Sequence, residues 1–179
     1  MARRETAARR YADAAFEIGR AERTLDRWER DLAELREAVA QAELQQLIEH
    51  PAVPYAEKER VLRRVVGSDV APQAMNLILL MVRRGRPGQI GPMVGRFTEL
   101  LRRERGISLA EVRTAQPLDD EQRDAITERL RSLTGDKIEM SEVVDESLIG
   151  GIAVRIGDRL YDASVRSRLE RLRARLTST

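Results

Sequence analysis

The sequence predicts an α+β protein in which a six-helix bundle is followed by a small domain of β-α-β-β-β-α order. Residues 1–106 contain repeated stretches whose apolar side chains recur every three or four positions, as on one face of a helix. Residues 107–179 include stretches in which polar and apolar side chains alternate, as they do in strands. A composition with 35% charged and only 3% aromatic residues is typical of helices with narrow apolar stripes.

The change of pattern after Gly106 divides the chain into two expected domains. We expect an all-α domain over residues 1–106 and an α+β domain over residues 107–179. A chain of 179 residues can bury roughly 70% of its unfolded surface if it forms one compact body. The length is therefore sufficient for one domain or for two small ones.

Two long helices and one short helix are expected first. Within residues 4–20, small side chains share one side with Tyr11 and Phe16, so that another helix can approach closely. Within residues 25–39, apolar side chains step by three and four and keep one seam buried. A short continuation stops before Pro51, because the residue that precedes a proline is pushed out of the helical conformation.

Three further helices complete the expected bundle. One runs from Tyr55 to Val66 and ends at Gly67, a residue type common after a helix end. The next begins around Pro72, runs through Val82 and is apolar nearly all round. Such a helix is either central or offers surplus apolar surface to a partner. The sixth helix has one apolar side and closes at Gly106.

The second domain begins with a strand, a helix and another strand. A short strand is expected at residues 111–115, where apolar side chains alternate with polar ones. A helix follows, and Asp119 and Gln122 have the spacing of a reciprocal N-terminal cap. Residues 137–144 alternate again and predict a second strand.

A β-hairpin that leads directly into a final helix is the most informative local pattern. Gly157 and Asp158 form a two-residue connection with glycine first, which favours a type II′ turn. Counting outward pairs Ile156 with Arg159, Val154 with Tyr161, and Ile152 with Ala163. Ser164 can then cap a helix whose apolar side chains are Val165, Leu169, Leu172 and Leu176. The pattern describes architecture and contains no catalytic constellation.

The residue types exclude several kinds of chemistry. Without cysteine there is no disulfide, thiolate nucleophile or cysteine zinc site. We interpret His50 as a helix-end residue, and the acidic run of residues 119–121 as a helix cap and not a metal site. Gly150 and Gly151 precede a strand, whereas phosphate loops follow a strand and open a helix. We therefore expect no catalytic, cofactor-binding or metal-binding residues, and no cofactor.

Charge and hydropathy limit the expected partners. No apolar run approaches the ~18 residues that a membrane span requires, and residues 1–10 lack the apolar core of a secretory signal. We expect membrane contact only through other proteins. The 32 basic and 30 acidic residues nearly cancel, and arginine rather than lysine supplies most of the positive charge. A solvated or protein-binding surface fits this pattern better than nucleic-acid binding.

A combination of C-terminal motifs resembles one known family. Residues 148–152 contain a double glycine, residues 156–158 a Gly-Asp turn, and residues 162–165 the sequence Asp-Ala-Ser-Val. Together they resemble the signature of the delta subunit of bacterial F-type ATP synthases, the counterpart of the mitochondrial oligomycin-sensitivity-conferring protein. Weaker matches occur at residues 9–16, 50–54 and 114–118, so that the resemblance covers essentially the whole chain. It departs at Ala15, where leucine is common, and at Ala163, where glycine is common.

The resemblance implies a non-catalytic stator subunit that links the catalytic head to the membrane-anchored b-subunit stalk and resists rotor torque during proton-driven ATP synthesis. It implies that residues 1–106 bind the N-terminal helix of the head's alpha subunit between the first and fifth helices. Residues 107–179 would bind the C-terminal end of the b subunit. The expected location is the cytoplasmic face of the bacterial cell membrane, with one copy per complex. An arginine-rich RNA-binding or ribosome-associated protein is the alternative, and an enzyme of unknown type comes third.

The residue pattern meets the same requirement independently. Small side chains on the first helix and surplus apolar surface on the fifth are what a helix-in-groove site needs. The residues expected to form the walls of this groove are Tyr11, Phe16, Leu77, Leu80 and Met81.

Overall fold

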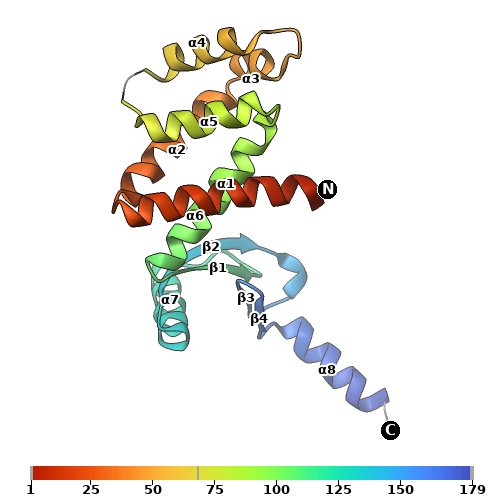
Figure 1. Cartoon of the computed structure of the whole chain (residues 1–179). Helices are drawn as coiled ribbons and strands as arrows, with labels where there is room; N and C mark the ends of the chain where they lie inside the picture. Colours follow the sequence, from red (N-terminus) through yellow and green to blue (C-terminus); the bar gives the residue numbers. More distant parts are fainter. Residues whose placement is uncertain (1, 68, 178–179) are drawn as a thin grey trace. The chain divides into compact units, whose positions relative to one another are not determined.

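The protein has an α+β fold, as the sequence predicted. The computed structural model describes residues 2–67 and 69–177, with side chains described over residues 7–67 and 69–174. The chain forms two compact units, Met1–Leu101 and Arg102–Thr179 (Figure 1). Each unit is described by itself.

The first unit is helical. Its elements are α1 (Ala2–Ala21), α2 (Leu25–Ala40), α3 (Ala42–Glu49), α4 (Tyr55–Val66), α5 (Pro72–Arg83), the short 3-10 helix η1 (Pro87–Gln89) and α6 (Ile90–Glu104), whose last residues enter the second unit. The predicted bounds of α4 are confirmed, and α5 begins at the expected proline. Figure 1 shows α5 between α4 and α1, and both helices contact it.

Aromatic side chains on three helices form the centre of the first unit's core. Phe97 of α6 is fully buried. Its ring centroid lies 6.1 Å from that of Phe16 on α1, in an edge-on arrangement, and 6.4 Å from that of Trp28 on α2. These contacts join the first two helices of the chain to the last helix of the unit.

A missing side chain lets α1 and α2 approach closely. The small residues Ala8, Ala12, Ala15 and Gly19 are all buried along α1. A Cβ atom at Gly19 would lie 2.9 Å from Cδ1 of Trp28, a separation that real Cβ atoms do not tolerate. The predicted role of the small residues on the first helix is therefore confirmed at this crossing.

A buried carboxylate connects α2 to the start of α5. The backbone N–H of Ala71, at the N-terminus of α5, donates a hydrogen bond of 2.9 Å to Oδ2 of Asp31. The same carboxylate lies 3.7 Å from Nε of Arg27, one turn earlier on α2. Asp31 is buried, so this bond satisfies a carboxylate and a helix N-terminus at once.

The second unit is built on a four-stranded mixed sheet. Its elements are β1 (Ile107–Thr114), α7 (Asp120–Thr134), β2 (Lys137–Val144), the 3-10 helix η2 (Glu146–Leu148), β3 (Ile152–Ile156), β4 (Arg159–Asp162) and α8 (Val165–Thr177). The strand order is β2-β1-β3-β4. β1 pairs in parallel with β2, and α7 connects these two strands in the chain. The pairs β1–β3 and β3–β4 are antiparallel.

The predicted hairpin register is confirmed. Ile156 pairs with Arg159 and Val154 with Tyr161, and the N–H of Ala163 donates to the carbonyl of Ile152 at 2.9 Å. Gly157 has φ +58° and Asp158 does not have a positive φ, which agrees with the type II′ turn.

The first strand of the sheet is longer than predicted. It was expected at residues 111–115 and extends over Ile107–Thr114. Residues 107–110 pair with residues 137–140 of β2, a parallel partner that lies beyond α7 in the chain. Local alternation does not report such a distant pairing partner, and this is why the sequence pattern missed the first half of the strand.

One face of the sheet and α7 enclose the second core. Its buried residues are Ala110, Val112, Leu130 and Val154. The predicted reciprocal cap of α7 is confirmed: Asp119 Oδ1 accepts from the N–H of Gln122 at 2.7 Å, and Oε1 of Gln122 accepts from the N–H of Asp119 at 3.3 Å.

Glu142 joins β2 to the segment that precedes α7. One carboxylate oxygen accepts from the backbone N–H of Leu118 at 2.7 Å, and the other accepts from Arg123 Nη2 at 3.0 Å. The hydrogen bond from the Leu118 N–H, followed by the one from Arg123, holds the pKa of Glu142 below its ordinary value of 4.5.

We expect Gly19→Ala to lower the free energy of unfolding of the first unit by about 1 kcal/mol. A methyl group against Trp28 costs about 1–3 kcal/mol in overpacking, which exceeds the gain of about 0.5–1 kcal/mol from replacing a glycine within a helix. Gly95→Ala is the matched control, since a Cβ at Gly95 of α6 meets nothing within 4 Å, and it should stabilise the unit. Urea unfolding followed by the fluorescence of Trp28, the single tryptophan, measures both. Equal effects of the two substitutions would contradict this account.

We expect Glu142→Gln to weaken the second unit at neutral pH and to matter progressively less in acid. Because the folded-state pKa of Glu142 is lowered, its stabilisation is fully present above about pH 4.5 and is lost as the pH falls through the folded-state value. Urea unfolding at pH 7 and pH 3, followed by backbone amide NMR signals of the second unit, measures the change. Glu128→Gln, at an exposed position of α7, is the control. A difference between Glu142→Gln and the wild type that is the same at both pH values would show that this carboxylate contributes no pH-dependent stability.

Candidate protein-binding surfaces

The five predicted groove residues fall into two groups in the structure. Leu80 is 41% exposed, and Tyr11 and Leu77 are half-buried at the edge of the core. Phe16 is only 7% exposed and Met81 is fully buried. Phe16 packs on Phe97, and Met81 lies on the inner side of α5, so neither side chain reaches the surface. The two therefore support the surface from beneath and do not line it.

Ile18 is an exposed residue on α1 that the sequence analysis did not select. It continues the outer stripe of α1 that starts at Tyr11 and passes through Ala14, at steps of three and four residues. The sequence analysis followed the adjacent inner stripe, which fills the core. The surface formed by Tyr11, Ala14 and Ile18 with Leu77 and Leu80 is called the α1/α5 surface below, and the two helices are in contact.

Three polar residues of the first unit, on or beside α3, α4 and α5, have structural roles. Nδ1 of His50 accepts from the N–H of Ala52 at 3.2 Å, which agrees with the prediction of a helix-end residue. Lys58 Nζ donates to the carbonyl of Ile48 at 2.7 Å and so ties α4 to α3. The guanidinium of Arg83 lies 5.8 Å from the ring centroid of Tyr55, which joins α5 to α4.

A pocket of about 680 Å³ lies where α5 ends. It is lined by Ala7, Ile48, Glu49, Pro51, Lys58, Val82, Arg84, Gly85, Arg86, Pro87, Gly88 and Gln89. None of the five predicted groove residues lines it.

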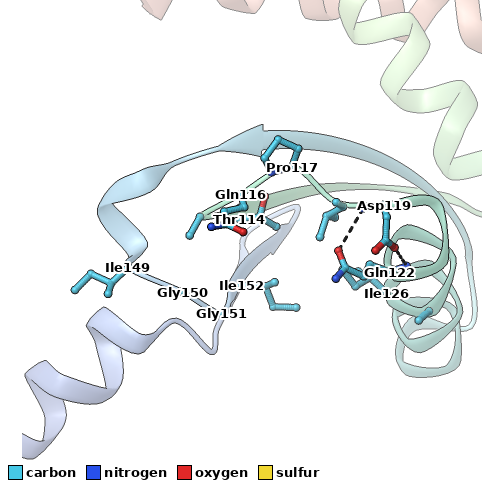
Figure 2. Close-up of a pocket in the computed structure, with 13 residues that line it drawn as sticks. Thr114, Gln116, Pro117, Asp119, Gln122, Ile126, Ile149, Gly150, Gly151 and Ile152 are labelled. Carbon is cyan, nitrogen blue, oxygen red and sulfur yellow. Dashed lines mark hydrogen bonds between the residues drawn. The ribbon is translucent and has the colours of Figure 1, made fainter.

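A second pocket, of about 820 Å³, lies in the second unit at one end of the sheet. The end of β1, the start of α7 and residues 149–152 form its walls. Figure 2 shows Ile149 at one end, Ile126 with the cap of α7 at the other, and the double glycine between them. The hydroxyl of Thr114 is buried in this region without a hydrogen-bond partner. Asp119 and Gln122 bind each other's backbone, as the dashed lines in Figure 2 mark.

The double glycine permits a close crossing of two segments. A Cβ at Gly151, whose φ is +76°, would lie 2.7 Å from the carbonyl oxygen of Ala163 and 3.1 Å from Cα of Ser164. The carbonyl of Gly150 accepts from the N–H of Val165 at 2.9 Å. The start of α8 is therefore held against residues 150–151 by contacts that only glycine allows at position 151.

The residues between β4 and α8 form a local turn and a helix cap. The N–H of Ser164 donates to Oδ1 of Asp162 at 2.9 Å, and Ser164 Oγ accepts from the N–H of Ser167 at 3.2 Å. Hydrogen bonds from Ser164 hold the pKa of Asp162 below its ordinary value. The predicted capping role of Ser164 is confirmed, and the Asp-x-Ser-Val motif is explained as the device that starts α8.

The apolar stripe predicted for the last helix is not covered. Val165, Leu169 and Leu172 are all exposed. Leu176, also predicted for this stripe, lies outside the residues whose side chains are described. A helix therefore forms where it was predicted, and the described part of its apolar side faces solvent.

The described side chains form no arrangement typical of a catalytic or metal site. No group of three or more histidine, cysteine or acidic residues among them could hold a metal ion. None of the helices in the described part of the chain combines the length and hydropathy that crossing a bilayer requires. Among the described residues, large apolar side chains are exposed on the helices α1, α4, α5, α7 and α8, on the strands β1, β2 and β4, and at Ile149 before β3.

Comparison with known proteins identifies the family. The family model of the ATP synthase delta (OSCP) subunit matches residues 7–176. The delta subunit of ATP synthase from Desulforamulus reducens is 34% identical over 176 residues, covering 98% of this chain and 97% of the relative. The delta subunit from Synechococcus elongatus is 36% identical over 164 residues, covering 90% and 91%. A chain in the cryo-EM structure of the Toxoplasma gondii mitochondrial ATP synthase hexamer matches with a TM-score of 0.69 and 26% identity, covering 95% of this chain and 97% of that one.

The chain belongs to the ATP synthase delta (OSCP) subunit family. Members of this family are structural, non-catalytic stator subunits of ATP synthase. The relatives therefore confirm the predicted family and the prediction that the protein is not an enzyme. The comparisons offer no support for the RNA-binding alternative.

We expect Gly151→Ala to release the start of α8 and Gly157→Ala to leave it in place. Both glycines have positive φ, which costs an alanine about 1–2 kcal/mol, but only Gly151 has backbone atoms within 3.1 Å of the added methyl group. The Gly151 substitution should therefore cost about 1–3 kcal/mol more. Hydrogen exchange of the Val165 amide, which bonds to Gly150, measures the release. Equal exchange rates in the two variants would contradict the proposed crossing.

Proposed function

We propose that this chain links the catalytic head of an F-type ATP synthase to the end of its peripheral stalk through two separate surfaces. The domain of residues 1–106, as a six-helix bundle, binds the N-terminal helix of the alpha subunit. The domain of residues 107–179, of β-α-β-β-β-α order, binds the C-terminal end of the b subunit. One copy sits on each complex, at the cytoplasmic face of the bacterial cell membrane. The observation that carries the proposal is a match to ATP synthase delta subunits along nearly the whole chain.

The α1/α5 surface is the proposed site for the alpha-subunit helix. Tyr11 and Leu77 are half-buried and Leu80 is exposed, so a partner helix can remove apolar area from water without opening the core. Ile18 extends this surface along α1. Phe16 and Met81 keep the two helices in position from within.

Resistance to torque requires slow dissociation at both ends. Among related complexes, affinity differences arise mostly in the dissociation rate, and buried apolar anchors dominate that rate. A stator needs rigid contacts and no reactive group. The arrangement supports this requirement, since the α1/α5 surface lies on two helices that pack on one aromatic and aliphatic core.

We expect Leu80→Asp to weaken binding of a peptide with the sequence of the alpha-subunit N-terminus by about tenfold or more. Full burial of a leucine contributes about 1.5–3 kcal/mol, and an aspartate would bring an unpaired charge into the contact. Isothermal titration calorimetry with the full chain measures the affinity.

Val65→Asp is the matched control, because Val65 is similarly exposed on α4, outside the α1/α5 surface. It should bind the peptide as the wild type does. Unchanged affinity in the Leu80 variant, or an equal loss in both variants, would show that the helix binds elsewhere.

A further inference from the structure

We propose that the apolar stripe of α8, continued by Ile149, docks a single amphipathic helix whose own apolar stripe is flanked by acidic side chains. The inference rests on the proposed function, because the occupant is the end of the stalk that the second domain is proposed to bind. It adds the surface and the chemistry of that contact. The surface consisting of Ile149, Val165, Leu169 and Leu172 is called the α8 surface below.

The α8 surface is apolar and uncovered. Ile149 is 67% exposed, Leu169 is 52% exposed and Leu172 is 54% exposed. At about 100° per residue, Val165, Leu169 and Leu172 lie within one narrow stripe. Val165 begins this stripe at Gly150, to whose carbonyl its N–H is bonded. The stripe therefore starts at Gly150, the residue that follows Ile149 in the chain.

Ile149 also has an unfavourable backbone conformation. Ile149 has φ +66°, a left-handed conformation that is unfavourable for a β-branched residue. The 3-10 turn before it, in which its N–H donates to the carbonyl of Glu146 at 3.1 Å, places it there. Ile149 is therefore a strained residue whose side chain is exposed to solvent. A partner that covered it would remove its apolar area from water.

One residue of the α8 surface, Ile149, also lines a pocket of the second unit. Ile149 and Ile152 line the same pocket of about 820 Å³, which continues to Ile126 at the start of α7 (Figure 2). An exposed apolar stripe along one side of a helix is complementary to the apolar stripe of a second helix that lies along it. The absence of aromatic residues from the α8 sequence also favours a protein over a membrane.

Charge specifies the partner. The α8 sequence contains five arginines and one glutamate, whereas the whole chain has a net charge of only +2. By helical geometry, Arg168 and Arg171 follow one edge of the stripe, and Arg166 and Arg173 follow the other. A helix that seats its apolar side chains between these two edges would place its flanking residues beside arginines. Arg166 already pairs with Glu170, with 3.1 Å between Nε and Oε1, so acidic flanks are complementary mainly to the edge of Arg168 and Arg171.

The test measures binding to the full chain by fluorescence anisotropy. The labelled probes are the C-terminal segment of the b subunit from the same organism and two synthetic helices that share one leucine stripe and carry glutamate or lysine at its flanks. We expect the b-subunit segment to bind and the glutamate helix to bind at least tenfold more tightly than the lysine helix. Leu169→Asp should weaken binding of the b-subunit segment at least tenfold, and Arg168→Glu should weaken it about fivefold.

Matched controls lie on α7. Leu133 and Arg129 are exposed there, away from the α8 surface, so Leu133→Asp and Arg129→Glu should bind the probes as the wild type does. Circular dichroism melting curves of all four variants should coincide with that of the wild type, because each altered side chain is exposed.

The outcomes separate this inference from the proposed function. Binding of the b-subunit segment that is unaffected by Leu169→Asp would overturn the α8 surface and leave the proposed function standing. Binding of the glutamate helix, sensitive to Leu169→Asp, without binding of the b-subunit segment would support the surface and overturn its assignment to the stalk. Binding of phosphatidylglycerol vesicles in place of both helices would overturn the inference, because the occupant would then be a membrane.

Discussion

The close approach of backbone segments at two glycines is the constraint on which the rest of the structure depends. At Gly19 the missing side chain lets Trp28 pack against α1, and this brings both helices onto Phe97. At Gly151 it lets the residues before α8 cross the loop before β3. The two contacts are chemically different, one with an aromatic ring and one with a backbone carbonyl. Each of them sets the position of a helix that carries exposed apolar side chains.

Inner and outer apolar stripes on the same helices separate folding from binding. On α5, most apolar side chains enter the core, and Leu80 is left on the outer side. On α8, the described apolar side chains are all exposed. A monomer that functions alone gains nothing from such exposure, whereas a subunit of a larger complex buries these side chains on assembly. The arrangement agrees with membership of the ATP synthase delta (OSCP) subunit family.

The carboxylates of the second unit are used to hold backbone. The pKa values of Glu142 and Asp162 are lowered mainly by hydrogen bonds that join them to loop or cap residues. Asp145 follows the same pattern, since its pKa is lowered by hydrogen bonds from Ser147 in η2. Groups stabilised as anions in this way are poor proton donors at neutral pH. These carboxylates therefore serve as hydrogen-bond acceptors for neighbouring backbone and side-chain groups.

Residue order alone determined the local features of this protein: the α+β class, the bounds of α4, the cap of α7, the hairpin register and the family. These depend on neighbours within a few positions, where propensity, turn chemistry and spacing decide the outcome. Only the tertiary structure decided which apolar residues are buried. The pattern did not distinguish the buried Phe16 and Met81 from the exposed Ile18, because a helix that is apolar on several sides does not reveal which side its neighbours cover. The length of β1 was decided by its pairing with β2, which is distant in the chain. The stripe of α8 is exposed because no described segment of the chain covers Val165, Leu169 and Leu172.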